Sequence, residues 1–414
     1  MLLDPVSSLV LTFCLLGFLL YKKVSVGLVL VIAPILLALL TLKPADALMV
    51  LYDVIDPYSQ SGLFALLIMT STFFIAWLSY LYDDCGEVRN LGDSLNRFTK
   101  RTGLLLALSP AIMSLLPIAG GALLSAPIVS SLIKDSNLCP ARGSYINLWF
   151  RHVPVLVYPL AQSIILASAL TGTPLFIVIL FQTPVVVVMT VVGYFLGLRG
   201  GTYRKVEELT WNRGDVKILV KSILPIASAT ALAITLSITW KGLVQQGLSL
   251  LVASVTGIIV LITISRMARK IIGKSLLKWG IYDVTLATYG AFLFQNVMTI
   301  AGIPSVLKPL ALSSTSELPL LASMPLLLSF LMGSVISSLT ISTSMLAGTI
   351  EFTPKMVMLL YTSSFLGYVI SPLHLCLVFT LKYFNTTLYE FYKYAIPSTV
   401  MTYLATLLFY FILP

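Results

Sequence analysis

Charged residues are scarce in this chain. Asp, Glu, Lys and Arg make up 10% of the 414 residues, whereas 58% of the residues are hydrophobic. Soluble domains usually contain about 25% charged residues, so this shortage excludes an ordinary soluble protein and predicts an all-α polytopic membrane protein. We attribute the net charge of +10 to basic residues on cytoplasmic loops, and we expect the lipid bilayer as a partner and no nucleic acid.

Catalytic and metal-binding patterns are also missing. The four cysteines lie far apart without a CxxC pair, and the chain has no HExxH, GxSG or phosphate-binding loop for ATP. We therefore expect no enzymatic activity, no metal site and no cofactor, apart from a sodium ion that carbonyls and hydroxyls can hold. Asp283 and Glu351 lie at the ends of apolar segments. A cation antiporter needs carboxylates buried in the membrane. The shortage of acidic residues within the apolar segments therefore favours an anionic or neutral solute.

Ten apolar runs have the length of membrane-spanning helices. No basic residue precedes the first run and no small-residue cleavage site follows it, so we interpret it as a span with the N-terminus outside. The predicted spans are 4–21, 24–42, 61–82, 145–171, 174–197, 216–239, 246–265, 280–301, 355–381 and 391–412.

Two further runs, 102–133 and 318–350, do not fit a single crossing. Each has about 32 residues, or about 48 Å as one helix, against a hydrocarbon core of ~30 Å, and two full crossings need about 40 residues. Both runs also carry Pro, Gly or hydroxyl residues near their centres. We therefore predict two re-entrant hairpins, each with a turn near the middle of the membrane.

The basic residues support this layout. Ten crossings and two hairpins leave four basic residues on one side, namely Lys43, Lys241, Lys308 and Lys355. The other side then carries Lys22, Lys23, Arg89, Arg97, Lys100, Arg101, Lys134, Arg142, Arg199, Arg204, Lys205, Arg213, Lys217, Lys221, Arg266, Arg269, Lys270, Lys274 and Lys278. This asymmetry predicts a plasma-membrane protein with both termini outside.

The order of segments repeats once along the chain. Residues 1–197 form three spans, a hairpin and two spans, residues 198–215 form a polar cytoplasmic linker, and residues 216–414 repeat the order. Five crossings is an odd number, so the second half enters the membrane upside down. A shift of 213 residues places Gly120 on Gly333 and YPL (158–160) on SPL (371–373). We therefore predict two inverted-topology repeats.

The hairpin centres are candidate solute sites, because inverted repeats with discontinuous helices bind solutes near the midplane. Non-helical backbone at that depth faces protein or a water-filled cavity. The alternative for the first hairpin is a small-residue packing motif formed by Gly121 and Ser125. The candidate residues are Pro117, Gly120, Gly121 and Ser125 in the first hairpin and Gly333, Ser334, Ser337 and Ser338 in the second.

Two spans contain prolines that should break their helices: Pro154 and Pro159 in one, and Pro372 in its counterpart. Arg151 precedes the first break. It is a candidate ligand for a carboxylate or phosphate, and the alternative is a side chain that reaches the inner interface. The only two histidines, His152 and His374, are candidates for proton coupling. Further candidate solute ligands in these spans are Asn147, Gln162 and Ser371.

Three of these stretches resemble the hallmark sequences of a known family: LPIAGGALLSAPIV (116–129), INLWFRH (146–152) and SPLHLCLVFTLKYF (371–384). The family is domain of unknown function 401, a group of prokaryotic integral membrane proteins similar to the ion transporter superfamily. The resemblance implies two inverted repeats with re-entrant hairpins, as in dicarboxylate and citrate carriers, and names no substrate. It places the family's Gly-Gly-Ala hairpin on Gly120 to Ala122, its Arg-His pair on Arg151 and His152, and its Ser-Pro-x-His stretch on 371–374. An acidic or aromatic residue that often follows the Arg-His pair is replaced here by VPVLVY.

The sequence favours a secondary transporter that moves a small anion by alternating access, coupled to sodium or protons. A cation/proton antiporter is the alternative within the same class. From other classes, an intramembrane lipid-modifying enzyme and a structural membrane subunit stay open, as does assembly into a homodimer.

Overall fold

The computed structural model describes residues 4–87, 90, 102–115, 122–203, 213–303, 317–347 and 349–414. Over these ranges the chain is helical, and its only β-type pairing is an isolated bridge between Ala347 and Ile350. The first half contains α1 (Pro5–Tyr21), α2 (Val26–Thr41), α3 (Pro44–Asp53), α4 (Gln60–Asp84), α6 (Thr102–Met113), α7 (Ala122–Asp135), α8 (Pro140–His152), η1 (Pro154–Leu156), α9 (Gln162–Thr171), α10 (Leu175–Gly193) and η2 (Tyr194–Leu198). The second half contains α11 (Arg213–Thr239), α12 (Leu243–Ser265), α13 (Arg269–Ser275), α14 (Trp279–Ile300), α16 (Leu318–Met332), α17 (Val335–Leu346), α18 (Pro354–Ile370), α19 (Leu375–Phe384) and α20 (Leu388–Ile412).

Local sequence signals account for several helix ends. The Asp4 carboxylate accepts a hydrogen bond from the Ser7 backbone N–H (3.0 Å), and Pro5 occupies the first turn of α1, where no N–H partner is needed. At the start of α20, Thr387 and Glu390 form a capping box. This cap begins the helix at Leu388, three residues before the predicted 391.

Six helical segments are long and apolar enough to cross a membrane: 60–84, 175–198, 216–239, 243–265, 354–384 and 388–412. They confirm a multi-pass helical protein. The predicted spans 4–21 and 24–42 correspond to the shorter helices α1 and α2, of 17 and 16 residues. The predicted span 280–301 corresponds to α14, and the predicted span 145–171 is divided between α8 and α9.

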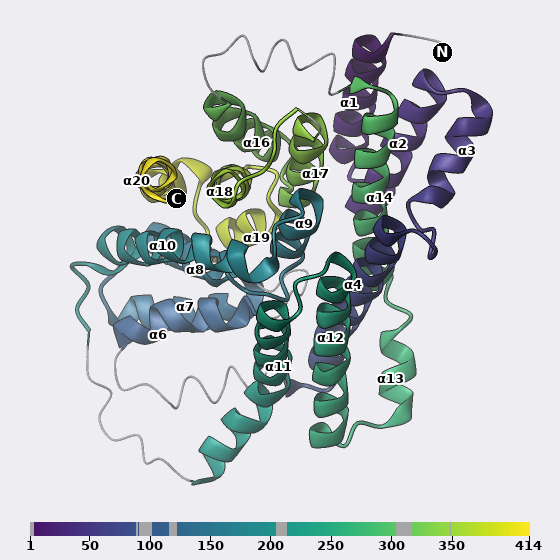
Figure 1. Cartoon of the computed structure of the whole chain (residues 1–414). Coiled ribbons are helices and arrows are strands. Elements are labelled where there is room, and N and C mark those ends of the chain that lie inside the picture. Colours follow the sequence, from purple (N-terminus) through teal and green to yellow (C-terminus); the bar gives the residue numbers. More distant parts are fainter. Residues whose placement is uncertain are drawn as a thin grey trace.

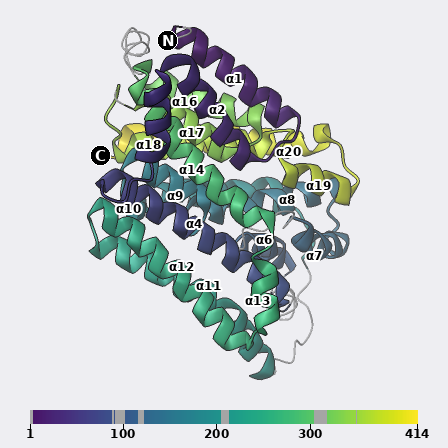
Figure 2. The ribbon, with the colours of Figure 1, turned by 90° about the vertical axis from the view of Figure 1, so that its right-hand side faces the viewer.

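The helices form two groups, and each group takes helices from both halves of the chain (Figure 1). We call α1–α4 with α11–α14 the straight-helix bundle, and α6–α10 with α16–α20 the hairpin bundle. In the straight-helix bundle, the long helices lie in one row in the order α11, α12, α4, α14, α2, α1 (Figure 2). The centre of this row falls between α4 and α14, which occupy equivalent places in the two halves.

The hairpin bundle has the same reciprocal arrangement. α7 packs on α19, and its counterpart α17 packs on α9. α6 packs on α8 as α16 packs on α18, and α10 contacts α20. The main contacts between the two bundles are those of α14 with α17 and α9, α4 with α9, and α10 with α11.

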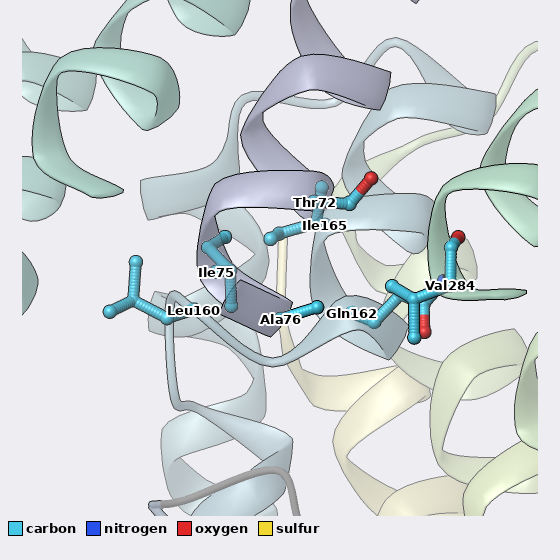
Figure 3. Close-up of a pocket in the computed structure, with 7 residues that line it drawn as sticks. All are labelled: Thr72, Ile75, Ala76, Leu160, Gln162, Ile165 and Val284. Carbon is cyan, nitrogen blue, oxygen red and sulfur yellow. The ribbon is translucent and has the colours of Figure 1, made fainter. Parts of the chain in front are cut away.

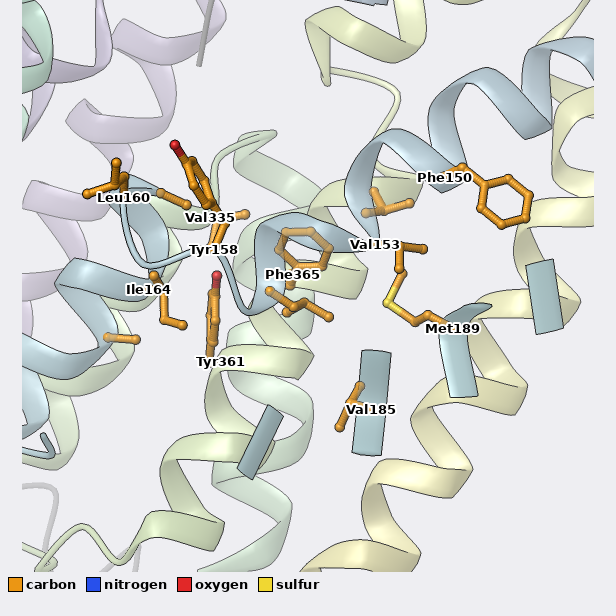
Figure 4. Packing of buried hydrophobic residues seen from close by; sticks show 14 of the residues in the cluster. Phe150, Val153, Tyr158, Leu160, Ile164, Val185, Met189, Val335, Tyr361 and Phe365 are labelled. Atoms are coloured by element: carbon orange, nitrogen blue, oxygen red, sulfur yellow. The ribbon is translucent and has the colours of Figure 1, made fainter. Parts of the chain in front are cut away.

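A continuous apolar core fills the hairpin bundle. Phe150 and Val153 at the end of α8 lie near Met189 of α10 and Phe365 of α18, and all four are buried (Figure 4). Tyr361 is buried in the same core, one turn of α18 before Phe365. The first break is therefore held inside packed protein, whereas Pro372 and Leu373 of the second break are exposed.

Gly367 allows α18 to pack tightly against α16. A Cβ at this position would lie 2.2 Å from the Leu326 carbonyl oxygen, whereas a Cβ at Gly17 of α1 would meet nothing within 4 Å. We expect Gly367→Ala to lower the free energy of unfolding by about 1–3 kcal/mol because the backbone must move apart. Gly17→Ala, the matched control, should leave stability unchanged or raise it, because alanine favours helix. Thermal unfolding in detergent measures both, and equal melting temperatures would contradict the close packing.

Candidate functional site

Both proline-containing spans are broken, as predicted. In the first, α8 ends at His152, a short 3₁₀ turn covers Pro154–Leu156, and α9 begins at Gln162. In the second, α18 ends at Ile370 and α19 begins at Leu375. Proline removes a backbone donor and its ring crowds the preceding turn, which favours each break. Residue type alone does not decide it, because Pro34, Pro184 and Pro397 lie inside continuous helices.

Tyrosine hydroxyls satisfy carbonyls at both breaks. Pro159 leaves the Val155 carbonyl without its helical donor, and the Tyr361 hydroxyl lies 3.4 Å from that oxygen. At the second break, the Tyr392 hydroxyl donates to the Ile370 carbonyl (2.7 Å). Both tyrosines belong to the second half of the chain, so the first break depends on a residue from the other half.

The second hairpin turns at Gly333 and Ser334, between α16 and α17. Gly333 has a φ of +61°, in the left-handed region that favours glycine, and Ser334 caps α17 by accepting from the Ser337 N–H (3.2 Å). This turn packs against the break between α18 and α19, because a Cβ on Gly333 would lie 2.8 Å from the Leu373 side chain. Ser371 in the same break donates to the Phe330 carbonyl (2.6 Å).

The first hairpin consists of α6 and α7, which pack together. Three candidate residues of its centre, Pro117, Gly120 and Gly121, lie outside the described residues. The described end of α6 reaches the first break, because the Met113 carbonyl accepts a hydrogen bond from Arg151 (3.3 Å). Each hairpin therefore contacts the broken span that follows it in the sequence.

Arg151 is buried in the protein and is only 6% exposed. Its side chain is therefore enclosed by protein. Among the described residues its hydrogen bond goes to a neutral carbonyl, and the side-chain ion pairs join Lys221 to Glu87 and Lys278 to Asp84. A buried cation without an acidic partner is costly, so this site has an unbalanced positive charge.

The two histidines lie beside each other, close to Arg151. The ring centroids of His152 and His374 are 4.8 Å apart and nearly perpendicular, and the Tyr368 ring lies 3.7 Å from His374. His152 Nδ1 is 2.7 Å from the Leu148 carbonyl, whereas neither nitrogen of His374 has a hydrogen-bond partner among the described residues. The charge of Arg151 acts on both imidazoles. We call Arg151, His152, His374 and Tyr368 the Arg–His cluster.

Buried hydroxyls are concentrated on α17 and α18. Ser338 donates to the Pro325 carbonyl (2.6 Å) and lies 3.1 Å from the Ser364 hydroxyl, while Ser337 bonds to Ser334 (3.0 Å). Other hydroxyls in this group have no partner in the described part of the chain: Thr340, Ser342, Ser344 and Ser363. Such groups are costly to bury dry, so they mark a region that suits water or a polar ligand.

Ser125 and Asn147 bond to each other instead of facing an open space. The Ser125 hydroxyl donates to Asn147 Oδ1 (2.7 Å), and the amide nitrogen of Asn147 donates to the Ala122 carbonyl (3.1 Å) and to Thr380 (3.2 Å). These bonds join α7, α8 and α19. Gly121, the other residue of the packing alternative, lies outside the described residues.

Gln162 spans the two bundles. Its side-chain nitrogen donates to the Val284 carbonyl (3.0 Å) and lies 3.5 Å from the Thr288 hydroxyl, both on α14. Beside it is a cavity of about 40 Å³ between α4, α9 and α14 (Figure 3). This volume holds only a few water molecules, so the bundles are closed against each other at this point. The cavity is lined by Thr72, Ile75, Ala76, Leu160, Gln162, Ile165 and Val284.

Two acidic residues, Asp283 and Asp84, act at helix ends. The Asp283 carboxylate accepts from the Gly27 N–H at the start of α2 (3.0 Å), and Asp84 pairs with Lys278 (2.7 Å). No group of three His, Cys, Asp or Glu side chains suited to a metal ion occurs within the described residues.

Sequence reasoning did not identify Tyr368 or Met113 as parts of the site. A signal for Tyr368 exists, because it lies four residues before Pro372, where proline withdraws the helical donor. Met113 takes part through its backbone carbonyl, so its side-chain type gives no indication of the role.

The fold and the site thus define a helical, multi-pass membrane protein with two broken spans that meet at a buried cationic centre. The chain belongs to the family described as protein of unknown function (DUF401), whose model matches residues 5–413. No curated protein matches the chain at a significant level.

Proposed function

We propose that this protein is a secondary transporter that moves a small anion across the cell membrane by alternating access. The observation that carries the proposal is Arg151, a buried guanidinium that donates to one neutral carbonyl and has no carboxylate partner among the described residues. A guanidinium binds the two oxygens of a carboxylate or phosphate through a pair of hydrogen bonds. An anion at this position supplies the missing negative charge.

The surroundings of Arg151 support a site for a solute. The two spans that meet there are broken, and half-helices at the midplane are the usual ligand-binding elements of such transporters. Both breaks are contacted by a helical hairpin, through Met113 in the first half and Leu373 in the second. We propose that these hairpins are re-entrant and that the turn at Gly333 and Ser334 closes over the anion.

We further propose that the two halves are inverted repeats. The element order supports this, including a short helix before the third long helix of each half, α3 and α13. The reciprocal contacts support it too, since α2 packs on α14 as α12 packs on α4. A pseudo-two-fold axis between α4 and α14 exchanges these pairs. With this arrangement the basic loops lie inside and both termini outside.

Alternating access requires movement of the hairpin bundle relative to the straight-helix bundle. The Arg–His cluster belongs wholly to the hairpin bundle, so the site can travel with it. The boundary is crossed by few polar bonds, among them Gln162 to Val284 and Gln295 to the Leu170 carbonyl (3.0 Å). We propose transport in preference to lipid chemistry because no hydroxyl of the described serines bonds to either histidine, so no serine nucleophile is paired with a base.

Thermal shift of the purified protein tests anion binding. We expect at least one anion among lactate, succinate, citrate, phosphate and sulfate to raise the melting temperature in a concentration-dependent manner. A ligand at about 100 times its Kd stabilises the folded state by ~2.7 kcal/mol. Each anion is tested as its sodium and its N-methylglucamine salt, with the chlorides as controls for ionic strength. Stabilisation by sodium chloride alone, with no effect of any anion, would contradict the proposal and favour a cation carrier.

A further inference from the structure

The chain has two histidines, and the fold brings both to one point. His152 is the last residue of α8, at the first break, and His374 precedes α19, at the second break. The two rings come from different halves of the chain and meet edge to face with centroids 4.8 Å apart. Both side chains are buried beside Arg151.

The hydrogen bonds of the two histidines leave nitrogen lone pairs that can accept a proton. His152 Nδ1 lies 2.7 Å from the Leu148 carbonyl, which can only accept, so this nitrogen carries the hydrogen and Nε2 keeps its lone pair. His374 has no partner at either nitrogen among the described residues, so at least one further lone pair is unused. The pair therefore offers two nitrogen atoms that can bind a proton without breaking an existing bond.

The charged and titratable groups facing the pair explain when that proton can bind. Arg151 comes from α8 and Tyr368 from α18, with Cys376 of α19 beyond Tyr368. The described contact from α6 is the neutral Met113 carbonyl. No described carboxylate acts on either imidazole. A proton added to this apolar, positively charged place is opposed by Arg151 until a negative charge binds there.

We infer that the His152–His374 pair is the proton-coupling element of the transporter, and that anion and proton bind together and cross the membrane as symported cargo. This inference rests on the proposed anion site at Arg151. The proton comes from water on the side where the anion enters, binds one imidazole nitrogen, and leaves to water with the anion on the other side. No covalent bond of the anion changes. Sodium is not required.

Proton uptake on anion binding tests the inference directly. Detergent-solubilised full-length protein in weak buffer, free of sodium, is mixed with N-methylglucamine lactate or sulfate between pH 6.5 and 8 while a pH indicator is followed. Lactate and sulfate keep their own charge over this range, since carboxylates titrate near pH 4. We expect uptake of about one proton per bound anion and an apparent Kd that rises about tenfold per pH unit, because linked binding is reciprocal.

Amino-acid variants test whether the two histidines, and not neighbouring residues, take up the proton. The double variant His152→Gln with His374→Gln should lower proton uptake to near zero and make the apparent Kd independent of pH, whereas the single variant that keeps the titrating imidazole should retain the uptake. Cys376→Ala, two residues from His374, is the matched control and should keep the wild-type proton uptake. Size-exclusion profiles verify folding. If a histidine variant misfolds, the number of protons that the wild-type protein takes up per bound anion still tests the inference.

The outcomes distinguish the two proposals. Anion binding without proton uptake by the wild-type protein, or uptake that survives in the double histidine variant, overturns the proton-coupling inference and leaves the anion transporter in place. Absence of binding by every anion of the panel contradicts the proposed function, and the coupling inference falls with it.

Discussion

Arg151→Ala is expected to abolish uptake of the anion into proteoliposomes while the protein still folds. Arg151 is the described buried cation without an acidic partner, and its side chain ends at the first break. Loss of one partner of a buried, hydrogen-bonded charge pair costs about 2–5 kcal/mol, so we expect transport at low substrate concentration to fall at least about 30-fold. Initial uptake rates of the anion that gives the largest thermal shift provide the measurement.

Two further arginine variants serve as controls. Arg151→Lys keeps the charge without the planar pair of donors, and we expect an intermediate rate. Arg142→Ala removes an arginine from the other end of the same helix, where its guanidinium donates to the Arg199 carbonyl (3.0 Å). This variant should transport within about twofold of the wild type, because a surface interaction contributes little. Wild-type rates in Arg151→Ala would remove Arg151 from the solute site.

A cleavable crosslink between the two bundles is expected to stop transport completely and reversibly. Gln162 of α9 and Thr288 of α14 approach to 3.5 Å across the boundary between the bundles. Because a glutamine side chain is longer than a cysteine side chain, a short bis-methanethiosulfonate reagent joins cysteines at both positions through cleavable disulfide bonds and holds the bundles in the closed arrangement. Because alternating access needs relative movement, uptake should fall to background and return when a reductant cleaves the bond.

A matched crosslink within one bundle provides the control. Thr72 of α4 and Thr288 of α14 have hydroxyls 3.2 Å apart, and both helices belong to the straight-helix bundle. Cysteines at 72 and 288 should crosslink equally well and leave uptake unaffected. The background protein has its native cysteines replaced by serine: Cys14, Cys85, Cys139 and Cys376.

Gln162 is itself a candidate solute ligand, so its replacement by cysteine can lower transport without any crosslink. A second pair of cysteines between the bundles is therefore needed. Leu170→Cys with Gln295→Cys joins α9 to α14 at another point, where the Gln295 amide donates to the Leu170 carbonyl (3.0 Å). Full transport by both crosslinked inter-bundle variants would show that the bundles do not move apart, and would exclude this mechanism of alternating access.

Much of the helix order was predictable from residue types, because the bilayer and the backbone impose local rules. Long uncharged runs become helices, and Pro154, Pro159 and Pro372 break them at the expected places. The turn at Gly333 was predictable for a similar reason, since a run too long for one crossing must turn where the left-handed conformation is least costly. These are properties of short segments, so a single sequence contains them.

The partners of the polar side chains could not be predicted in the same way. Asn147 and Gln162 were equivalent candidates in the sequence, yet one joins helices within the hairpin bundle and the other reaches across to α14. Arg151 had two alternatives, the interface or the interior, and the choice depends on where the end of α6 lies. Each of these bonds joins residues far apart in the chain.

The sequence alone therefore specified a helical, multi-pass membrane protein with two broken spans. The tertiary structure brought His152 to His374 and left Arg151 without a carboxylate among the described residues. The physical reason is that propensity and hydropathy act over one helix, whereas the electrostatic balance of a buried charge depends on every helix packed around it.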